Sequence, residues 1–320
     1  MSRCFELAKK LRKFNVTPYF FIKEDNRAIN LIKELGFQFF TFSKTSNDKK
    51  ELSMLINLHR KIKFDCLIVD LKKTKNKNFF IRLEKICKTV VIDNTNKNSL
   101  YADLIIWPWV KEQYSKNVIL NNSQKILVGP KYMLLGNIKK NWKRRRRQNS
   151  ILISMGGSDK RGLTIKIIKS FQKTKYKFHA DIVLGRFFSD SEKILEAIKN
   201  DKRFAVIRNN EGLISVMSSY KVGIFSFGIT TFEAFFANLP SLVISHSNEN
   251  DVYAKKTAVY DCMRYLGKYD MVNFDKLPQI TFALMENSEL YKKYSSNGQN
   301  LVDGKGTERV SKIIVDIIKK

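Results

Sequence analysis

The chain has 320 residues, of which 59 are Lys or Arg and 30 are Asp or Glu, so its formal net charge is +29. This length exceeds one typical core and suits two domains, and the 43% apolar content lets both domains bury a core. The sequence predicts no membrane-spanning helix, because no apolar run is long enough, and no secretory signal, because the start MSRCFELAKKLRKF is charged throughout.

The first half of the chain alternates helical and strand patterns. In the segment 2–13, Cys4, Leu7 and Leu11 share one face of a predicted helix, and Gly36 is placed to cap the end of the next one. Helical patterns cover residues 2–13, 26–36, 52–59 and 78–88, and strand patterns cover 16–23, 37–42, 64–71, 89–93 and 102–109. Strands that are apolar on both faces and alternate with helices predict a parallel sheet covered by helices.

The second half repeats this plan and ends in a helix. Strand patterns cover residues 150–155, 179–185, 204–209, 221–227 and 240–245, and the last helical pattern covers 307–320. We predict an α/β protein of two doubly wound, Rossmann-like domains, 1–143 and 148–320, with the last helix packing back on the first domain. The break between them is the basic run Arg144–Arg147, which has no apolar periodicity.

The chain begins inside a helical pattern, with no strand before it. A strand, a loop and a helix normally open a doubly wound domain. We therefore expect the first strand and the first loop of the N-terminal domain to be missing, and Met1 to lie within the first unit rather than before it.

Cysteine and histidine are few and scattered. No CxxC pair or other metal-ligand spacing occurs, so we expect a reducing cytoplasm, no metal site and no cofactor. The residues concerned are Cys4, Cys66, Cys87, Cys262, His59, His179 and His246.

Positive charge is spread over the whole chain. We interpret it mainly as a lysine-rich composition, and the alternative is binding to nucleic acid, an anionic membrane surface or acidic substrates. No helix-turn-helix signal, RNP-like aromatic pattern or zinc motif is present, so we expect no specific nucleic-acid partner. The run KKNWKRRRRQN at 139–149 is an exception to the even spread.

Two predicted strands run into glycine and then directly into a helix, as MGGSD at 155–159 and as FGITT at 227–231. Glycine permits a positive φ and a close backbone approach, and the following helix N-terminus favours a phosphate. In an open parallel sheet, ligands bind beyond the carboxyl ends of the strands. Neither turn matches GxGxxG or a Walker loop. We predict a phosphate site, and the alternative is that Gly156, Gly157 and Gly228 only make tight turns.

Thr230 and Glu233 admit two interpretations. Their spacing matches a capping box, in which each side chain binds a backbone amide of the other residue. Alternatively, a carboxylate in the first helical turn above a phosphate site accepts hydrogen bonds from ribose hydroxyls. The spacing alone favours neither.

Several segments occur in an order that resembles one group of two-domain enzymes. They are LVGPKYMLL (127–135), ILISMGGSD (151–159), GIFSFGITTFEAFFANLPSLVI (223–244), NEN (248–250), LG (266–267) and VDGKGTERV (302–310). Together they resemble the pseudaminic-acid-pathway UDP-sugar hydrolases and the related spore-coat-polysaccharide proteins, described as glycosyltransferases. Both groups resemble the lipid-linked N-acetylglucosaminyl transferase of peptidoglycan synthesis. The resemblance covers essentially the whole chain.

This resemblance implies a GT-B fold, with a UDP-sugar in the cleft between two facing domains. In the family, the second glycine turn and its glutamate hold the nucleotide, the first turn faces the diphosphate, and the residues after the next strand lie at the sugar. The matching residues here are, in that order, Gly228, Thr230, Thr231 and Glu233, then Gly156, Gly157, Ser158 and Asp159, then Asn248, Glu249 and Asn250.

The main departure from the family lies at the start. The family opens with a GxGHxxRC loop whose histidine is the candidate catalytic base. Arg3 and Cys4 match its end, which implies a substrate-side Arg3, while the glycines and the histidine are absent. We therefore expect this chain to bind UDP and to turn over nucleotide sugar poorly. His246, after a predicted strand, is the remaining candidate base, and the alternative is a solvated loop residue.

The resemblance implies hydrolysis of a UDP-linked diacetamido-trideoxy sugar to UDP and free sugar in pseudaminic acid biosynthesis. Two alternatives are a UDP-sugar glycosyltransferase of surface polysaccharide synthesis and a catalytically impaired relative that still binds UDP. We expect a cytoplasmic protein in which Arg144, Arg145, Arg146 and Arg147 contact the anionic inner face of the membrane.

Overall fold

The computed structural model describes residues 2–71, 75–93, 98–110, 125–136, 148–185, 188, 191–207 and 213–319. The basic run Arg144–Arg147 lies outside these ranges. The chain forms two compact units, Met1–Leu134 with Lys305–Lys320, and Leu135–Gly304. Among the described helices, none has both the length and the apolar composition of a membrane-spanning segment.

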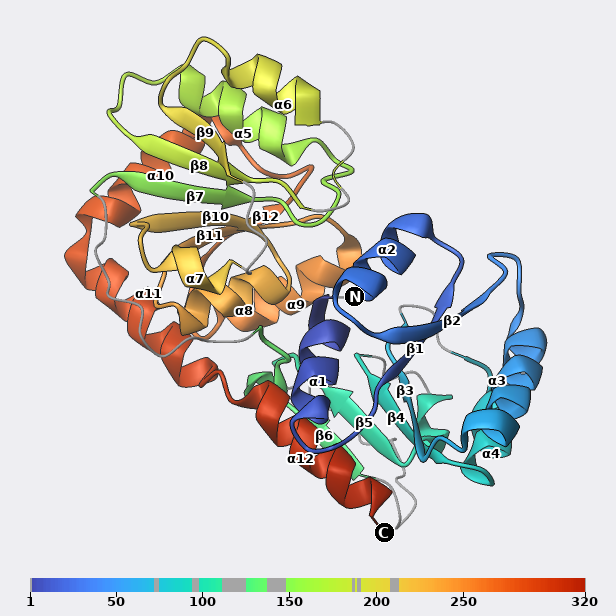
Figure 1. Cartoon of the computed structure of the whole chain (residues 1–320). Coiled ribbons are helices and arrows are strands. Elements are labelled where there is room, and N and C mark those ends of the chain that lie inside the picture. The colour runs from blue at the N-terminus through green and yellow to red at the C-terminus, as the bar shows by residue number, and fades with distance from the viewer. Residues whose placement is uncertain are drawn as a thin grey trace. The chain divides into compact units, whose positions relative to one another are not determined.

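Unit 1 contains two parallel sheets, covered by helices (Figure 1). β1 pairs with β2, and β3, β4, β5 and β6 pair in that order. Its elements are α1 (Ser2–Arg12), β1 (Tyr19–Lys23), α2 (Asn26–Glu34), β2 (Gln38–Phe42), α3 (Asp48–Ile62), β3 (Cys66–Val69), α4 (Lys77–Glu84), β4 (Lys88–Ile92), η1 (Ser99–Tyr101), β5 (Leu104–Trp107), β6 (Lys125–Val128), η2 (Pro130–Tyr132) and α12 (Gly306–Ile318).

The C-terminal helix α12 packs within unit 1. Val310 and Ile314 share a buried cluster with Leu7 of α1, and Lys10 pairs with Glu308 at 3.1 Å. A Cβ at Gly306 would overlap the backbone of Met133, so glycine permits this close approach at the start of α12.

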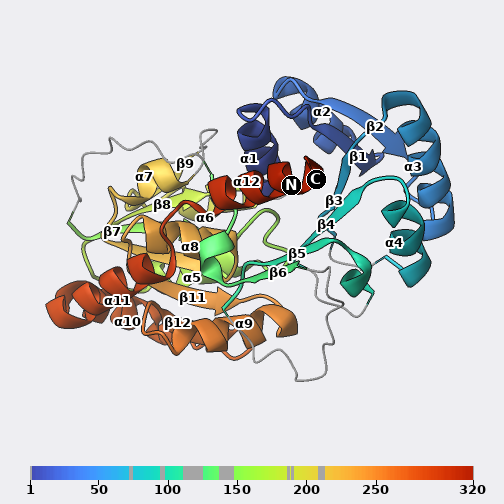
Figure 2. The same cartoon turned by 90° about the horizontal axis from the view of Figure 1, so that it is seen from below.

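Unit 2 is one six-stranded parallel sheet with helices on both faces (Figures 1 and 2). The strand order is β12-β11-β10-β7-β8-β9. Its elements are β7 (Ser150–Ser154), α5 (Leu163–Gln172), β8 (His179–Val183), α6 (Ser191–Ile198), β9 (Phe204–Ile207), α7 (Ile214–Met217), β10 (Val222–Ser226), α8 (Ile229–Phe236), β11 (Ser241–Ser245), α9 (Asn248–Ala258), β12 (Arg264–Lys268), η3 (Phe274–Lys276), α10 (Leu277–Glu286) and α11 (Ser288–Leu301).

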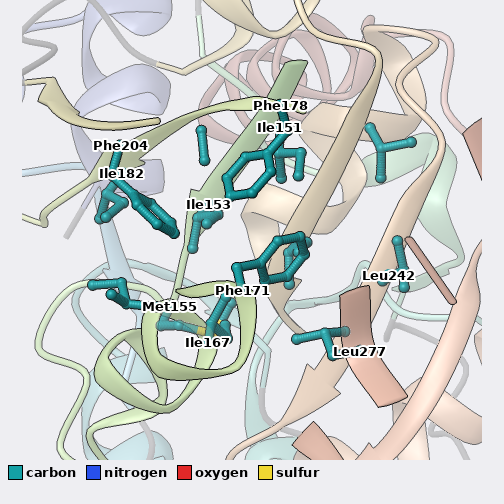
Figure 3. Close-up of a cluster of buried hydrophobic side chains, with 14 of the residues drawn as sticks. Ile151, Ile153, Met155, Ile167, Phe171, Phe178, Ile182, Phe204, Leu242 and Leu277 are labelled. Carbon is teal, nitrogen blue, oxygen red and sulfur yellow. The ribbon is translucent and has the colours of Figure 1, made fainter. Parts of the chain in front are cut away.

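The core of unit 2 explains the continuous apolar runs of its strands. Ile151 and Ile153 of β7 are fully buried and pack with Phe171 of α5 and Ile182 of β8 (Figure 3). The intervening Leu152 is equally buried on the opposite face of the sheet, with Phe225. A strand buried on both faces can carry no alternating polar residues.

Local sequence sets several helix ends. Asp25, Asn47 and Asn76 each precede a helix and accept a hydrogen bond from an amide in its first turn. Gly36 follows α2 with a φ of 68°, the left-handed conformation in which glycine carries no penalty. The predicted cap at Gly36 is confirmed.

Candidate functional site

The strand order of unit 2 reverses beside β7. The chain adds β8 and β9 on one side of β7, then returns to place β10, β11 and β12 on the other side. β7 and β10 pair in parallel, with Ser154 opposite Phe225, so the segments that follow these two strands meet at one edge. Such a topological switch point is where open α/β sheets bind ligands.

The first glycine turn follows β7 and is tightly packed. Gly156 has a φ of 85°, and a Cβ there would lie 3.2 Å from Oγ of Ser226, the last residue of β10. A Cβ on Gly185, beyond β8, would lie 2.5 Å from Cα of Gly157. Three strand ends therefore fix this turn. Gly185 was missed from sequence because no helix pattern follows it directly.

Asp159 in this turn has a structural role. Its two carboxylate oxygens accept hydrogen bonds from the amides of Leu163 and Thr164, at 2.9 and 2.8 Å. These are the first amides of α5, so Asp159 satisfies groups that would otherwise bind a phosphate. Ser158 is half-buried and Gly157 exposed. The structure shows a capping function for Asp159, and its contact with substrate stays a prediction.

The second glycine turn follows β10 and is open. Gly228, the N-cap of α8, has a φ of 165°, which is extended backbone that any residue adopts. A Cβ there would meet no atom within 4 Å. The expectation of a positive φ at Gly228 is wrong, but the absence of a side chain leaves the N-terminus of α8 accessible.

The side chain of Thr231 is buried and hydrogen-bonds to the backbone of this turn. It is 0% exposed, its Oγ1 accepts from the amide of Gly228 at 3.3 Å, and the hydroxyl donates to the carbonyl of Ser226 at 3.3 Å. Thr231 is therefore the N3 residue of the cap. Of the two interpretations of Thr230 and Glu233, the capping box is wrong, because α8 begins at Ile229, two residues earlier than that box requires. The Thr231 hydroxyl is thus hydrogen-bonded within its own turn, and its contact with substrate stays a prediction.

The segment after β11 is tied to the second turn. Ser247 caps α9, and Asn250 donates through Nδ2 to the carbonyl of Phe227 at 3.0 Å. Asn248 and Glu249 are exposed in the first turn of α9, and His246 is half-buried directly after β11. Because β11 pairs with β10, the predicted residues of unit 2 all follow three adjacent strands, β7, β10 and β11.

Two basic residues at this edge were not predicted. The guanidinium of Arg161 lies 4.4 Å from the ring centroid of Tyr269, which follows β12. Lys268, the last residue of β12, donates to Oδ1 of Asn248 at 3.2 Å and pairs with Asp270 at 3.0 Å. Their place at the site depends on β12, an edge strand that the sequence pattern did not reveal.

Arg3 is engaged in an ionic cluster of unit 1. It donates to both oxygens of Asp70, at 2.9 and 2.5 Å, and to Asp93 at 2.7 Å. Asp70 follows β3 and Asp93 follows β4, so the cluster joins the start of α1 to the carboxyl edge of the sheet. Asp93 also accepts from Nε1 of Trp109. Arg3 is thus paired with two carboxylates of unit 1, and its contact with substrate stays a prediction.

Charge and burial compete in this cluster. Burial alone would raise the pKa of Asp70, but the hydrogen bonds and positive charge of Arg3 lower it below its ordinary value. Burial and the neighbouring Asp70 raise the pKa of the Cys4 thiol to about 12, and this thiol donates to Asp70 at 2.9 Å. Cys4 is therefore a neutral hydrogen-bond donor.

No family model matches the chain. It is 28% identical over 304 residues to the uncharacterized protein MJ1062 of Methanocaldococcus jannaschii, covering 90% of this chain and 60% of that protein's length. It is 24% identical over 248 residues to the spore coat polysaccharide biosynthesis protein SpsG of Bacillus subtilis, covering 75% of this chain and 73% of SpsG.

Solved structures share the fold over nearly the whole chain. MurG of Acinetobacter baumannii aligns with a TM-score of 0.71 and 12% identity, over 98% of this chain and 95% of MurG. The UDP-GlcNAc 2-epimerase of Neisseria meningitidis, bound to UDP-GlcNAc, aligns with a TM-score of 0.66 and 15% identity, over 98% of this chain and 96% of the epimerase. The chain has a GT-B fold. The predicted fold class is confirmed.

Proposed function

We propose that the chain is a nucleotide-sugar enzyme that binds UDP at the switch point of unit 2. The observation that carries this proposal is the pairing of β7 with β10, which brings the two glycine turns together. SpsG acts in polysaccharide biosynthesis by name, and the structurally similar epimerase was crystallised with UDP-GlcNAc. Both similarities support a UDP-sugar as the ligand.

The structure distinguishes the two helix N-termini at this edge. Asp159 accepts hydrogen bonds from the first amides of α5, whereas the N-cap of α8 is Gly228, at which a Cβ would meet no atom of the described residues within 4 Å. We therefore assign the diphosphate to the start of α8, where helix amides stabilise negative charge on the leaving group. Gly156 and Gly157 line the neighbouring turn, and Thr231 supports the backbone from inside.

Bond cleavage at the sugar needs a base for water or for an acceptor hydroxyl. Of the three histidines, His59 lies in α3 and His179 starts β8, whereas His246 follows β11 at the carboxyl edge. His246 is accordingly the candidate base in unit 2, with Asn248 and Glu249 beside it for the sugar.

We propose hydrolysis of a UDP-linked diacetamido-trideoxy sugar as the reaction, and the alternative is transfer of the sugar to an acceptor. The test is UDP release under single-turnover conditions, with and without acceptor sugars. Hydrolysis predicts slow UDP release in buffer alone. Release only with an acceptor supports a transferase, and UDP binding without release supports an impaired relative. Absence of UDP binding by calorimetry contradicts the whole assignment.

Glu233→Gln is expected to weaken UDP binding without loosening the fold. Glu233 is not the capping residue of α8, since the amide of Gly228 donates to Thr231 instead. The Glu233 side chain is half-buried and lies one turn into the helix. Loss of charged hydrogen bonds to ribose costs about 1.5–3 kcal/mol, which is roughly a 10- to 100-fold loss of affinity. Calorimetry with UDP measures this loss, and Glu286→Gln, at the exposed last residue of α10, is the control. A fall in melting temperature with unchanged affinity would contradict the ribose assignment.

A further inference from the structure

The carboxyl end of β12 lies level with the carboxyl end of β11. Lys268 pairs with Ser245 in the parallel register, and the amide of Tyr269 donates to the carbonyl of Ser245 at 2.8 Å. The segment that follows β11 begins with His246, the candidate base, and continues into α9. The side chain of Lys268 therefore starts beside the segment to which the sugar is assigned.

The two asparagines in the first turn of α9 differ in how far their side-chain amides are already used. The amide of Asn250 is used at both ends, because Oδ1 accepts from Ser247 at 2.6 Å and Nδ2 donates to the carbonyl of Phe227 at 3.0 Å. The side chain of Asn248 is exposed, and within the described part of the chain it makes one hydrogen bond, which Oδ1 accepts from Lys268 at 3.2 Å. Asn248 therefore keeps an amide group for a ligand, and Asn250 does not.

Lys268 determines which end of the Asn248 amide faces outward. An ammonium group can only donate hydrogen bonds, so the amide atom that faces it is the oxygen. The Nδ2 group, with its two N–H donors, is then turned away from Lys268 and has no partner among the residues that the structure describes. A side-chain amide that could otherwise present either end is thus held as a donor.

The ammonium group of Lys268 also has a donor left. Of its three N–H groups, one binds Asn248 and another pairs with Asp270 at 3.0 Å. The hydrogen bond to Asp270 raises the pKa of Lys268 above its ordinary value, so the ammonium group stays protonated at neutral pH. Asp270 also balances the charge of Lys268. Asn248 and Lys268 together therefore offer hydrogen-bond donors, and the positive charge between them is already paired.

We propose, resting on the proposed UDP-sugar function, that Lys268 and Asn248 form a donor pair that recognises the carbonyl oxygen of an N-acyl group on the sugar. Lys268 is the positioning residue that orients the Asn248 amide. A carbonyl oxygen has two lone pairs and no proton, so it can accept from both side chains at once. A hydroxyl carries a proton for which this pair offers no acceptor. A carboxylate is disfavoured, because Asp270 lies 3.0 Å from Nζ of Lys268 and repels a second negative charge.

The test separates recognition of the sugar from binding of the nucleotide. Dissociation constants are measured for UDP, UDP-glucose, UDP-glucuronic acid and the UDP-linked diacetamido-trideoxy sugar, from displacement of a fluorescent UDP analogue within seconds of mixing. Asn248→Asp keeps an acceptor for Lys268 but removes the outward N–H donors, and negative charge is tolerated at the start of a helix. Lys268→Met leaves the Asn248 amide free to rotate. Lys255→Met is the control, because Lys255 lies in the same helix, is 66% exposed and pairs with Asp251 at 2.8 Å.

The expected result for wild type is that the diacetamido sugar binds at least about tenfold more tightly than UDP-glucose. In Asn248→Asp and in Lys268→Met this ratio should fall to about threefold or less, while the affinity for UDP changes by less than about twofold. Lys255→Met should keep the wild-type ratio. Retained UDP affinity shows that each variant is folded and that the loss concerns the sugar.

Equal affinities of wild type for UDP-glucose and the diacetamido sugar would overturn the proposal, as would an unchanged ratio in either Asn248→Asp or Lys268→Met. Tighter binding of UDP-glucuronic acid than of the diacetamido sugar would indicate a carboxylate site and equally overturn it. In all these cases UDP still binds. Absence of UDP binding by wild type would instead contradict the proposed function itself.

Discussion

Gly228→Val is expected to lower UDP affinity by about 100-fold or more while the protein stays folded. The valine side chain occupies the open space at the N-terminus of α8, where the backbone must approach the diphosphate. Each hydrogen bond to a charged group contributes about 1.5–3 kcal/mol, and two such losses correspond to at least a 100-fold change. Calorimetric titration with UDP measures the effect.

The fold should tolerate this substitution. The φ of 165° at Gly228 is extended, and a Cβ meets no protein atom within 4 Å. Loss of the glycine N-cap costs no more than about 1 kcal/mol. Gly228→Ala is the graded control, with a smaller group in the same place and an intermediate loss of affinity. Unchanged UDP affinity in a folded Gly228→Val protein would contradict the assignment of the diphosphate to α8.

Arg3→Met is expected to destabilise unit 1 by about 3–5 kcal/mol near neutral pH, because it leaves Asp70 and Asp93 without their cation in a partly buried site. The side chains of Arg3 and Asp70 are each 13% exposed. Urea unfolding followed by tryptophan fluorescence reports this change, since Trp107 and Trp109 both lie in unit 1.

The contribution of Asp70 to the free energy of unfolding should change with pH in opposite directions in wild type and in Arg3→Met. The pKa of Asp70 is lowered in the folded protein, so its contribution to stability is complete above the unfolded pKa of about 3.9 and is lost as pH falls through the folded pKa. In Arg3→Met, burial then dominates and raises the pKa of Asp70, so protonation relieves a cost. The difference in unfolding free energy should be largest near neutral pH and shrink below about pH 4.

Lys312→Met is the matched control in the same unit, because Lys312 pairs with Glu308 at 2.9 Å and the two side chains are 58% and 43% exposed. Exposed ion pairs contribute about 0–1 kcal/mol. Equal unfolding free energies for wild type and Arg3→Met at neutral pH would show that the cluster does not hold α1 to the sheet.

The sequence by itself determined most of the secondary structure and the fold class, although its patterns did not predict β6 (Lys125–Val128) or β12 (Arg264–Lys268). Apolar runs such as 150–155 and 221–227 contain too few polar residues for a half-exposed strand, so these strands must be buried on both faces. Because such strands alternate with helices, the pattern predicts a doubly wound parallel sheet. It also placed the predicted residues of unit 2 after strand ends, because glycine before a helix marks that junction. β12 was missed, since RYLGK is a short, half-exposed edge strand interrupted by Gly267 at a φ of 111°.

Only the tertiary structure decided which partners within the fold several candidate residues have. Strand order, set by contacts between segments about 70 residues apart, brings the turn after β7 beside the turn after β10. Asp159, Thr231 and Arg3 all matched a ligand-binding pattern, yet each is committed to partners inside its own unit. Local spacing encodes which groups a residue can offer. Whether those groups are already hydrogen-bonded to a backbone amide or paired with a distant carboxylate depends on tertiary packing. The spacing of residues in the sequence does not specify this packing.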